Sequence, residues 1–183
     1  FKEDSDLVLG CKARWNYACT KLLDEYLALA YHREQGLPVV ITRFFNTIGP
    51  RQSGNYGMVV PTFINQGLAG GDITVYGSGD QKRCFMDVAD AVESLVRLVY
   101  ADAAVGEIFN VGNDVELSIN DLALQIQAKT GGEIIHLPYG DVYGPEFEDL
   151  DRRVPDNSKL EAVTGFRPNI PIGDTLDRIL KEL

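Results

Sequence analysis

Tyr17 and Lys21 are the residues whose types and spacing most directly suggest chemistry. They stand four positions apart in a run, 13–35, that is predicted to be one long helix, so the phenol and the ammonium project from the same side. A lysine beside a tyrosine stabilises the phenolate, which lets the hydroxyl act as a general base or acid near neutral pH. Chance alone produces this spacing roughly 0.3 times in a chain of this composition. Two unrelated surface residues are therefore the simpler interpretation of the motif by itself.

The predicted helix has a packing face and a second face that carries this pair. About 100° of rotation per residue places Tyr17, Lys21 and Ala28 at roughly 200 to 240° from Trp15. We expect the apolar stripe to pack on a sheet or a partner helix, which leaves the second face for chemistry. The stripe comprises Trp15, Ala18, Leu22, Leu23, Tyr26, Leu27 and Ala30.

A strand and a polar turn follow the helix. Gly36 and Pro38 predict its end, and the β-branched run 39–42 continues into 43–45 as a predicted buried parallel strand. From here the chain resembles the extended short-chain dehydrogenase/reductase family, and within it the NAD-dependent nucleotide-sugar epimerases, dehydratases and decarboxylases. The resemblance covers essentially the whole chain. Its landmarks are Tyr17-Ala-Cys-Thr-Lys21, Arg43-Phe-Phe-Asn46 to Gly49-Pro-Arg51, Val59-Val-Pro-Thr-Phe63, Tyr76-Gly-Ser-Gly-Asp-Gln-Lys-Arg83, Phe109-Asn-Val-Gly112 and Arg152-Arg-Val-Pro-Asp-Asn-Ser-Lys159.

Two features of that family are missing from the sequence. Its members begin with a glycine-rich strand-turn-helix that binds the dinucleotide pyrophosphate, and they place a Ser or Thr shortly before the tyrosine. The glycine clusters at 67–71, 77–79 and 131–132 do not stand between a first strand and a helix. We therefore expect this chain to be the carboxyl-terminal part of a longer enzyme.

The composition limits the classes of partner. The chain is 45% hydrophobic and has a net charge of −10, which opposes a nucleic-acid surface, and no apolar run approaches the roughly 20 residues that span a bilayer. Cys11, Cys19 and Cys84 show no metal or redox spacing, so we expect reduced thiols in the cytoplasm and no metal site. An anionic nucleotide would need a local cationic pocket. The candidate cations are Arg51, Lys82, Arg83, Arg152 and Arg153.

The rest of the chain alternates predicted strands and helices, which indicates an α/β protein. Helices are expected at 59–68, from Asp87 as N-cap, from Ser118 to Gly131, at 158–164 and at 174–183, and strands at 73–76, 107–111 and 134–137. The second of these helices should bury the stripe Val88, Ala91, Val92, Leu95 and Val99. Residues 139–157 are expected to form a loop.

The resemblance implies two domains. Residues 1–48 would be the carboxyl-terminal portion of an NAD-binding Rossmann domain, containing the catalytic helix and the strand after it. Residues 49–183 would form a smaller nucleotide-sugar-binding domain, with 83–112 returning to the Rossmann sheet.

The resemblance also assigns roles to residues. The tyrosine matching Tyr17 exchanges a proton with a sugar hydroxyl, and the lysine matching Lys21 holds the nicotinamide ribose and lowers the tyrosine's pKa. Asn46 matches an asparagine that contacts the nucleotide diphosphate, although Asn commonly closes such turns. Arg83 matches the arginine that clamps the diphosphate, against the alternative of a solvated strand residue. Arg51 is a candidate substrate contact, and the alternative is an arginine exposed without a role by a Gly-Pro-Arg turn.

The segment 143–156 carries the clue to the subfamily. Asp149 stands where many sugar epimerases place an acid that holds the nucleotide ribose, whereas Glu146 stands where they place an arginine. The arrangement resembles the UDP-glucuronate decarboxylases and the glucuronate 4-epimerases. In the decarboxylases, an arginine matching Arg153 reaches the reacting sugar or its carboxylate. The alternative is that Arg153 contacts the diphosphate or is a surface residue.

The implied reaction uses NAD and a UDP- or dTDP-linked sugar. Oxidation at C4, with Tyr17 as base, gives a transient 4-keto sugar that rotates, loses water or loses carbon dioxide before it is reduced again. The resemblance also implies a homodimer through the helix 14–34. Two other hypotheses stay open: an extended reductase of another substrate class, and a non-catalytic binding or assembly fragment.

Overall fold

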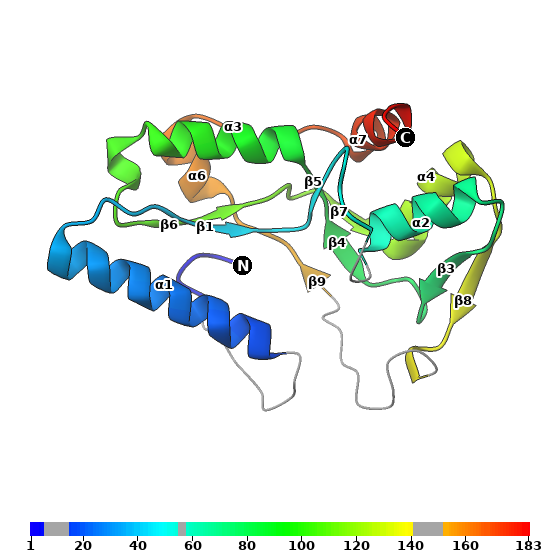
Figure 1. Ribbon diagram of the computed structural model, residues 1–183, viewed down its shortest axis with the longest axis horizontal. Coiled ribbons are helices and arrows are strands. Elements are labelled where there is room, and N and C mark those ends of the chain that lie inside the picture. The colour runs from blue at the N-terminus through cyan, green and yellow to red at the C-terminus, as the bar shows by residue number, and fades with distance from the viewer. Residues whose placement is uncertain (6–14, 55–57, 141–151) are drawn as a thin grey trace.

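The computed structural model describes residues 1–5, 15–54, 58–140 and 152–183 (Figure 1). Its helices are α1 (Asn16–Gln35), α2 (Val59–Leu68), α3 (Val88–Val99), the 3-10 helix η3 (Asp102–Ala104), α4 (Ile119–Thr130), α6 (Ser158–Thr164) and α7 (Ile172–Lys181). Its strands are β1 (Ile41–Phe44), β2 (Thr47–Ile48), β3 (Ile73–Tyr76), β4 (Lys82–Cys84), β5 (Met86–Asp87), β6 (Ile108–Val111), β7 (Glu116–Ser118), β8 (Ile134–Leu137) and β9 (Arg152–Arg153).

The strands pair mostly in parallel, which confirms the predicted α/β class. β1 pairs with β6, β2 with β5 and β3 with β8, all in parallel. The remaining sheet has the order β7–β4–β9, in which β7 is antiparallel and β9 is parallel to β4. Long-range parallel pairing with intervening helices is the signature of βαβ architecture.

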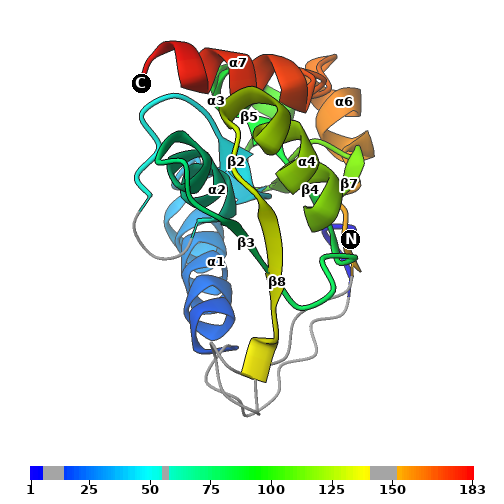
Figure 2. The ribbon, with the colours of Figure 1, turned by 90° about the vertical axis from the view of Figure 1, so that its right-hand side faces the viewer.

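Two regions with separate cores lie side by side. The β1–β6 region consists of α1, β1, α3, η3, β6 and α6, with α1 on one side of the strand pair and α3 and α6 on the other (Figure 1). The α2–α4 region contains α2, α4 and α7 with the strands β3, β8, β4 and β7 (Figure 2). Phe109, Val111 and Leu98 are buried in the first region, and Ile64, Leu122 and Leu176 are among those buried in the second.

Local signals predicted several elements correctly. The Asp87 carboxylate accepts a hydrogen bond from the Ala89 amide at 2.7 Å, and the Ser118 hydroxyl accepts one from the Asp121 amide at 3.0 Å, so both predicted N-caps are confirmed. The bounds of α2, β3, β8 and α6 match the predicted ranges. The loop prediction over 139–157 is wrong at Arg152 and Arg153, which form β9 by pairing with a strand distant in sequence.

The prediction for the buried face of α3 is also wrong. Only Ala91 of the expected stripe is buried, whereas Val92 and Val99 are 53% and 74% exposed. The buried residues of α3 are Asp90, Ala91, Ser94 and Leu98. Asp90 sets this orientation, because its carboxylate accepts hydrogen bonds from the amides of Asn169 and Ile170, both at 2.9 Å. Polar contacts therefore decide which face of the helix is buried.

α1 and its following strand β1 are less buried than the sequence predicts. No residue of α1, all of which is described, is buried, and β1 is partly exposed along its length. Of the expected stripe, Ala18 and Leu22 are partly covered, while Leu23, Tyr26 and Leu27 remain exposed. β1 has a hydrogen-bonded neighbour on one side, β6, so the prediction of a fully buried strand fails.

Within the described part of the chain, no helix combines the length and apolar character needed to cross a bilayer. In the same residues, no three or more His, Cys, Asp or Glu side chains gather as they would to hold a metal ion. The thiols of Cys19 and Cys84 are free, and Cys11 lies outside the described residues.

Candidate active site

Tyr17 and Lys21 lie on the exposed surface of α1 near its amino-terminal end. Tyr17 is 73% exposed, and the Lys21 ammonium donates a hydrogen bond to the Asp24 carboxylate at 2.8 Å. That hydrogen bond raises the pKa of Lys21 from its ordinary value, and Tyr17 makes a smaller contribution in the same direction. The predicted pair is thus present on one side of the helix, with its lysine held by an acid one turn further along.

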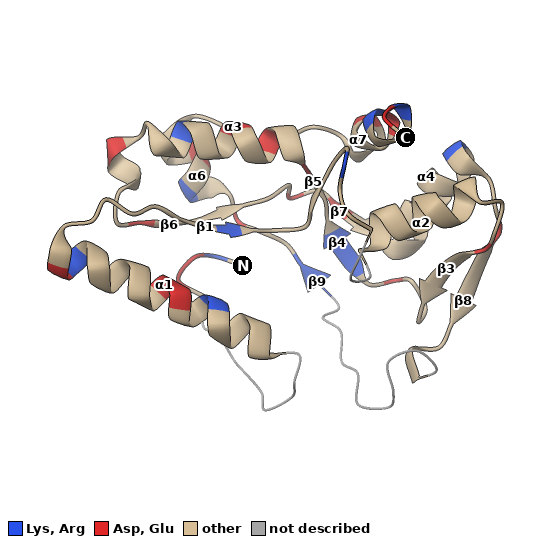
Figure 3. Ribbon diagram, in the orientation of Figure 1, with Lys and Arg blue, Asp and Glu red and all other residues tan. Residues whose placement is uncertain are grey.

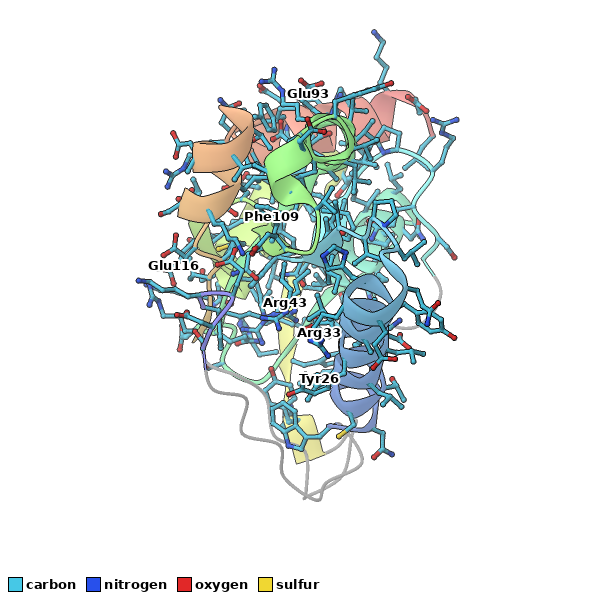
Figure 4. All side chains as sticks on the ribbon, turned by 90° about the vertical axis from the view of Figure 1, so that its left-hand side faces the viewer. Tyr26, Arg33, Arg43, Glu93, Phe109 and Glu116 are labelled. Atoms are coloured by element: carbon cyan, nitrogen blue, oxygen red, sulfur yellow. The ribbon has the colours of Figure 1, made fainter. Side chains whose placement is uncertain are left out.

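A largely buried ion pair between Arg43 and Glu25 fixes α1 against β1, the strand that follows it. The Arg43 guanidinium donates to both oxygens of Glu25 at 2.7 Å and to the carbonyl of Glu3 at 2.9 Å. Figure 4 shows Arg43 between α1 and the amino-terminal segment. Bidentate arginine–carboxylate pairs are directional as well as strong, so the contact sets the orientation of the helix that carries Tyr17.

Asn46 lies where β1 ends and the chain turns toward the second region. Its side-chain amide donates to the carbonyl of Cys84 at 2.9 Å, and its own carbonyl accepts from the Met86 amide at 2.9 Å. These two contacts join the end of β1 to the β4–β5 segment. The turn-closing interpretation of Asn46 therefore accounts for its amide nitrogen.

Arg83 and Arg153 are brought together by sheet pairing. β4 and β9 run in parallel with Arg83 opposite Arg153. The Arg153 guanidinium lies over the Phe45 ring, 5.1 Å from its centroid, in cation–π geometry. The residue keeps solvent exposure as a whole, although its charged head lies over this ring. Burial of that head and the neighbouring Arg83 cation lower the pKa of Arg153, and Tyr17 acts on it in the opposite direction.

The site is therefore built from three elements that are remote in sequence. α1 supplies Tyr17 and Lys21, whereas β4 and β9 supply the paired residues Arg83 and Arg153. Figure 3 shows the positive charge that gathers on β4 and β9. A proton-transfer group beside paired guanidinium groups suits a substrate that carries both a hydroxyl and anionic groups.

Two other predicted site residues, Arg51 and Asp149, are not found beside β4 and β9 in the described structure. Arg51 has a left-handed backbone, with φ of 63°, and its exposed guanidinium lies 3.9 Å from the Glu182 carboxylate near the end of α7. Asp149 lies outside the described residues. The structure thus places Tyr17 and Lys21 together on α1, pairs Arg83 with Arg153, places Asn46 at the junction of the two regions, and places Arg51 beside α7.

The sequence analysis gave neither Phe45 nor Glu116 a role near the candidate site. Phe45 is the last residue of the predicted buried strand. Glu116 binds Arg152 through two hydrogen bonds of 2.8 Å, yet these residues are 36 positions apart in the chain. Neither contact has a local sequence signal, because both depend on where β9 pairs.

The described residues fit part of the dinucleotide implied by the resemblance. Tyr17 and Lys21 are accessible on α1, as contact with a nicotinamide ribose requires. In the β1–β6 region, Gly36 ends α1 and Gly106 precedes β6, so neither of these left-handed glycines stands between a strand and a following helix as a pyrophosphate-binding turn does.

Comparison with known proteins identifies the family. Residues 2–112 match the NAD dependent epimerase/dehydratase family. The chain is 43% identical over 175 residues to a UDP-N-acetyl-alpha-D-glucosaminuronate decarboxylase of Bacillus cytotoxicus, covering 93% of this chain and 54% of the relative. It is 38% identical over 162 residues to UDP-glucuronic acid decarboxylase 1 of Xenopus tropicalis, covering 87% and 37%.

A solved structure agrees with these relatives. The UDP-glucuronic acid 4-epimerase from Bacillus cereus, in complex with UDP-glucuronic acid and NAD, superimposes with a TM-score of 0.80 at 27% identity, covering 91% of this chain and 51% of that one. The chain spans about half the length of these proteins, or less. On the matched residues and the shared fold, the chain belongs to the NAD dependent epimerase/dehydratase family.

Proposed function

We propose that this chain is the carboxyl-terminal part of an NAD-dependent enzyme that acts on a UDP- or dTDP-linked hexose or hexuronic acid through a transient 4-keto sugar. The observation that carries the proposal is the pairing of Arg83 with Arg153 on β4 and β9, in a chain that also presents Tyr17 and Lys21 on the exposed side of α1. The similarity to two UDP-uronic acid decarboxylases and a UDP-glucuronic acid 4-epimerase supports the same substrate class.

The proposed roles follow from the chemistry of the groups. Tyr17 removes the proton of the sugar hydroxyl and later returns it, and Lys21 releases Asp24 to hold the nicotinamide ribose. Bound NAD supplies a hydride acceptor at the same carbon. Because Tyr17 is exposed on α1 in this chain, the remainder of the protein has to cover it so that water is excluded during the reaction.

The arginines suit the anionic part of the substrate. Arg83, with Asn46, contacts the diphosphate, for which the planar guanidinium is well matched. Arg153, whose guanidinium lies over the Phe45 ring, contacts the sugar or its carboxylate. Arg51, in the turn after β2, remains a proposed substrate contact. Asp149 remains the residue proposed to hold the nucleotide ribose.

The outcome of the reaction depends on the substituent beside the keto carbon. A ketone β to a carboxylate stabilises the carbanion that decarboxylation leaves, so a uronic acid held with its carboxylate at Arg153 would lose carbon dioxide. If the carboxylate were instead retained and the keto sugar could rotate, the product would be the 4-epimer. We favour decarboxylation, since the two curated relatives named above are decarboxylases.

We also propose the division into domains given by the resemblance. Residues 1–48 belong to the NAD-binding domain, 49–183 to the sugar-nucleotide domain, and 83–112 returns in part to the first. The pairing of β1 with β6 and the two separate cores support this division. A reductase with an apolar substrate is less compatible with the cations on β4 and β9.

Replacement of Tyr17 tests the proposed chemistry. In the full-length enzyme, Tyr17→Phe should lower kcat by roughly 10²- to 10⁴-fold and leave the affinity for the sugar nucleotide unchanged, because the hydroxyl acts on the proton and contributes little to ground-state binding. Tyr31→Phe, at another exposed tyrosine of α1, is the matched control and should leave kcat unchanged. Equal activity in the Tyr17→Phe and parent enzymes would refute the assignment.

The exposed residues of α1 support a homodimer. Leu23, Tyr26 and Leu27 are each more than half exposed, and we propose that a second subunit covers them through the same helix. Sedimentation of the full-length protein at micromolar concentration should show a dimer, which Leu27→Glu should dissociate. A parent protein that sediments as a monomer would refute this interface. The free thiols of Cys19 and Cys84 support the cytoplasm as location.

A further inference from the structure

The strand that presents Arg153 pairs cations with cations. In the parallel pair β4–β9, Lys82 stands opposite Arg152 and Arg83 opposite Arg153. Like charges directly opposite each other on neighbouring strands destabilise the pairing. β9 is also only two residues long, so it has few backbone hydrogen bonds to offset this repulsion. Something outside β9 has to hold it in register.

The alternation of side chains separates the four cations onto two faces of this sheet. Arg83 and Arg153 share one face, on which Arg153 lies over the Phe45 ring. Lys82 and Arg152 share the other face. Glu116 of β7 lies on that face as well, because it pairs with Cys84 of β4, two residues after Lys82. The carboxylate of Glu116 therefore lies on the face of Lys82 and Arg152, and not on the face of Arg83 and Arg153.

Glu116 reaches across the central strand to bind β9. β7 and β9 flank β4 on its two sides, so their backbones are about 10 Å apart at the usual strand spacing. The Glu116 carboxylate accepts two hydrogen bonds of 2.8 Å, from Nε and from one terminal nitrogen of Arg152. The bridge spans the position of Cys84, which is fully buried. Such a fork-to-fork contact fixes the arginine in one orientation.

The Glu116–Arg152 contact is an ion pair between two charged groups. The hydrogen bond from Arg152 and its charge lower the pKa of Glu116, with a further contribution from Lys82. The same hydrogen bond raises the pKa of Arg152. Both partners are therefore charged at neutral pH. The chain beyond β9 is held separately, because the Asp156 amide donates a hydrogen bond to the Phe1 carbonyl at 2.8 Å.

We propose that Glu116 is a positioning residue, which holds β9 against β4 through Arg152 and so keeps the guanidinium of Arg153 over Phe45. Glu116 touches neither the substrate nor the reacting atoms, because it lies on the other face of the sheet. The consequence for catalysis rests on the function proposed above, whereas the effect on β9 does not.

A double-mutant cycle tests whether Glu116 acts through Arg153. In the full-length enzyme, Glu116→Gln should lower kcat/KM for a UDP-uronic acid about tenfold, and Arg153→Gln should lower it further. Glu116→Gln added to Arg153→Gln should then change kcat/KM by less than about twofold, since the residue it positions is already lost. Multiplicative effects, or parent-like kinetics of Glu116→Gln, would overturn the inference.

A charge-swapped pair and a matched control complete the kinetic test. Glu116→Arg combined with Arg152→Glu restores an ion pair across β4, so its kcat/KM should lie within about threefold of the parent, while each single reversal is impaired. Glu93 forms an exposed pair with Arg97 at 2.6 Å on α3, and Figure 4 shows it on a different face from Glu116. Glu93→Gln should leave the kinetics unchanged. Failure of the swapped pair to recover activity would contradict a role carried by the ion pair.

Hydrogen exchange separates this inference from the proposed function. Backbone amides of 152–154 should exchange about tenfold faster in Glu116→Gln than in the parent, and at the parent rate in Glu93→Gln. If the parent neither binds NAD nor converts a sugar nucleotide, the proposed function has failed, and this measurement still decides whether Glu116 holds β9. Unchanged exchange at 152–154 in Glu116→Gln would overturn the inference.

Discussion

The two regions of the molecule differ in how completely they bury their helices. α2 and α4 each bury four residues, whereas α1, which carries Tyr17 and Lys21, buries none. Within the described residues, the core cluster of the α2–α4 region has 13 buried members and that of the β1–β6 region has seven. The valines on the outer face of α3 are exposed as well. The α2–α4 region is packed on its own, while the β1–β6 region, which presents Tyr17 and Lys21, leaves apolar surface open.

The largest expected effect concerns the 183-residue chain by itself. It should show no turnover and no measurable NAD affinity, because the pyrophosphate-binding turn is not among its described elements and α1 is uncovered. It should keep weak affinity for a nucleoside diphosphate through Arg83 on β4 and Asn46 at the junction of the two regions. Isothermal titration with NAD and with UDP checks both statements. Stoichiometric NAD binding by this chain would mean that the two regions differ less than we infer.

Leucine truncation in the two regions should give unequal losses of stability. Leu122 on α4 is fully buried, and Leu122→Ala should lower the free energy of unfolding by about 2 to 5 kcal/mol. Leu27 on α1 is 56% exposed, so Leu27→Ala should change it by less than about 0.5 kcal/mol. Urea unfolding of the 183-residue chain measures both. Comparable losses would show that α1 is packed in solution.

Removal of Arg83 should affect one ligand and spare the other. Arg83→Ala in the full-length enzyme should raise the KM for the sugar nucleotide about 10- to 100-fold and leave NAD binding unchanged, because the lost contact is to the sugar diphosphate. Arg33→Ala, at an exposed arginine of α1, is the control and should alter neither. Unchanged affinity for the sugar nucleotide in calorimetry would refute the clamp.

The smallest effect concerns Asp87, which connects the regions. Burial raises its pKa, but hydrogen bonds from Arg178, Thr175 and the Ala89 amide outweigh burial, and the pKa lies below its ordinary value. A depressed native pKa stabilises the fold above the unfolded value of about 4, and this stabilisation is lost as the pH falls through the native pKa.

Asp87→Asn should therefore lower the free energy of unfolding by about 1 to 2 kcal/mol at pH 7 and make its decline below pH 4 shallower. Denaturant unfolding between pH 7 and pH 2.5 measures this difference. Parallel curves for the parent and Asp87→Asn would show that the buried carboxylate does not link the regions through its charge.

Local sequence determined the elements whose signals lie within a few residues. The caps at Asp87 and Ser118 act over two or three positions, and the Tyr17–Lys21 spacing is a property of one helix, so both were readable without a fold. The alternation of strands and helices likewise fixed the α/β class. The residue types of Arg83 and Arg153 suggested an anion site, although their proximity was not contained in either motif.

The tertiary structure decided which remote residues meet. β9 exists only because Arg152 and Arg153 pair with β4, and that pairing places Arg153 over Phe45 and brings Arg152 to Glu116. The orientation of α3 was set by the contacts of Asp90 with 169–170 and not by its valine stripe. These contacts join segments distant in the chain, and their free energies depend on the whole packing arrangement, so periodicity and capping along one segment cannot specify them.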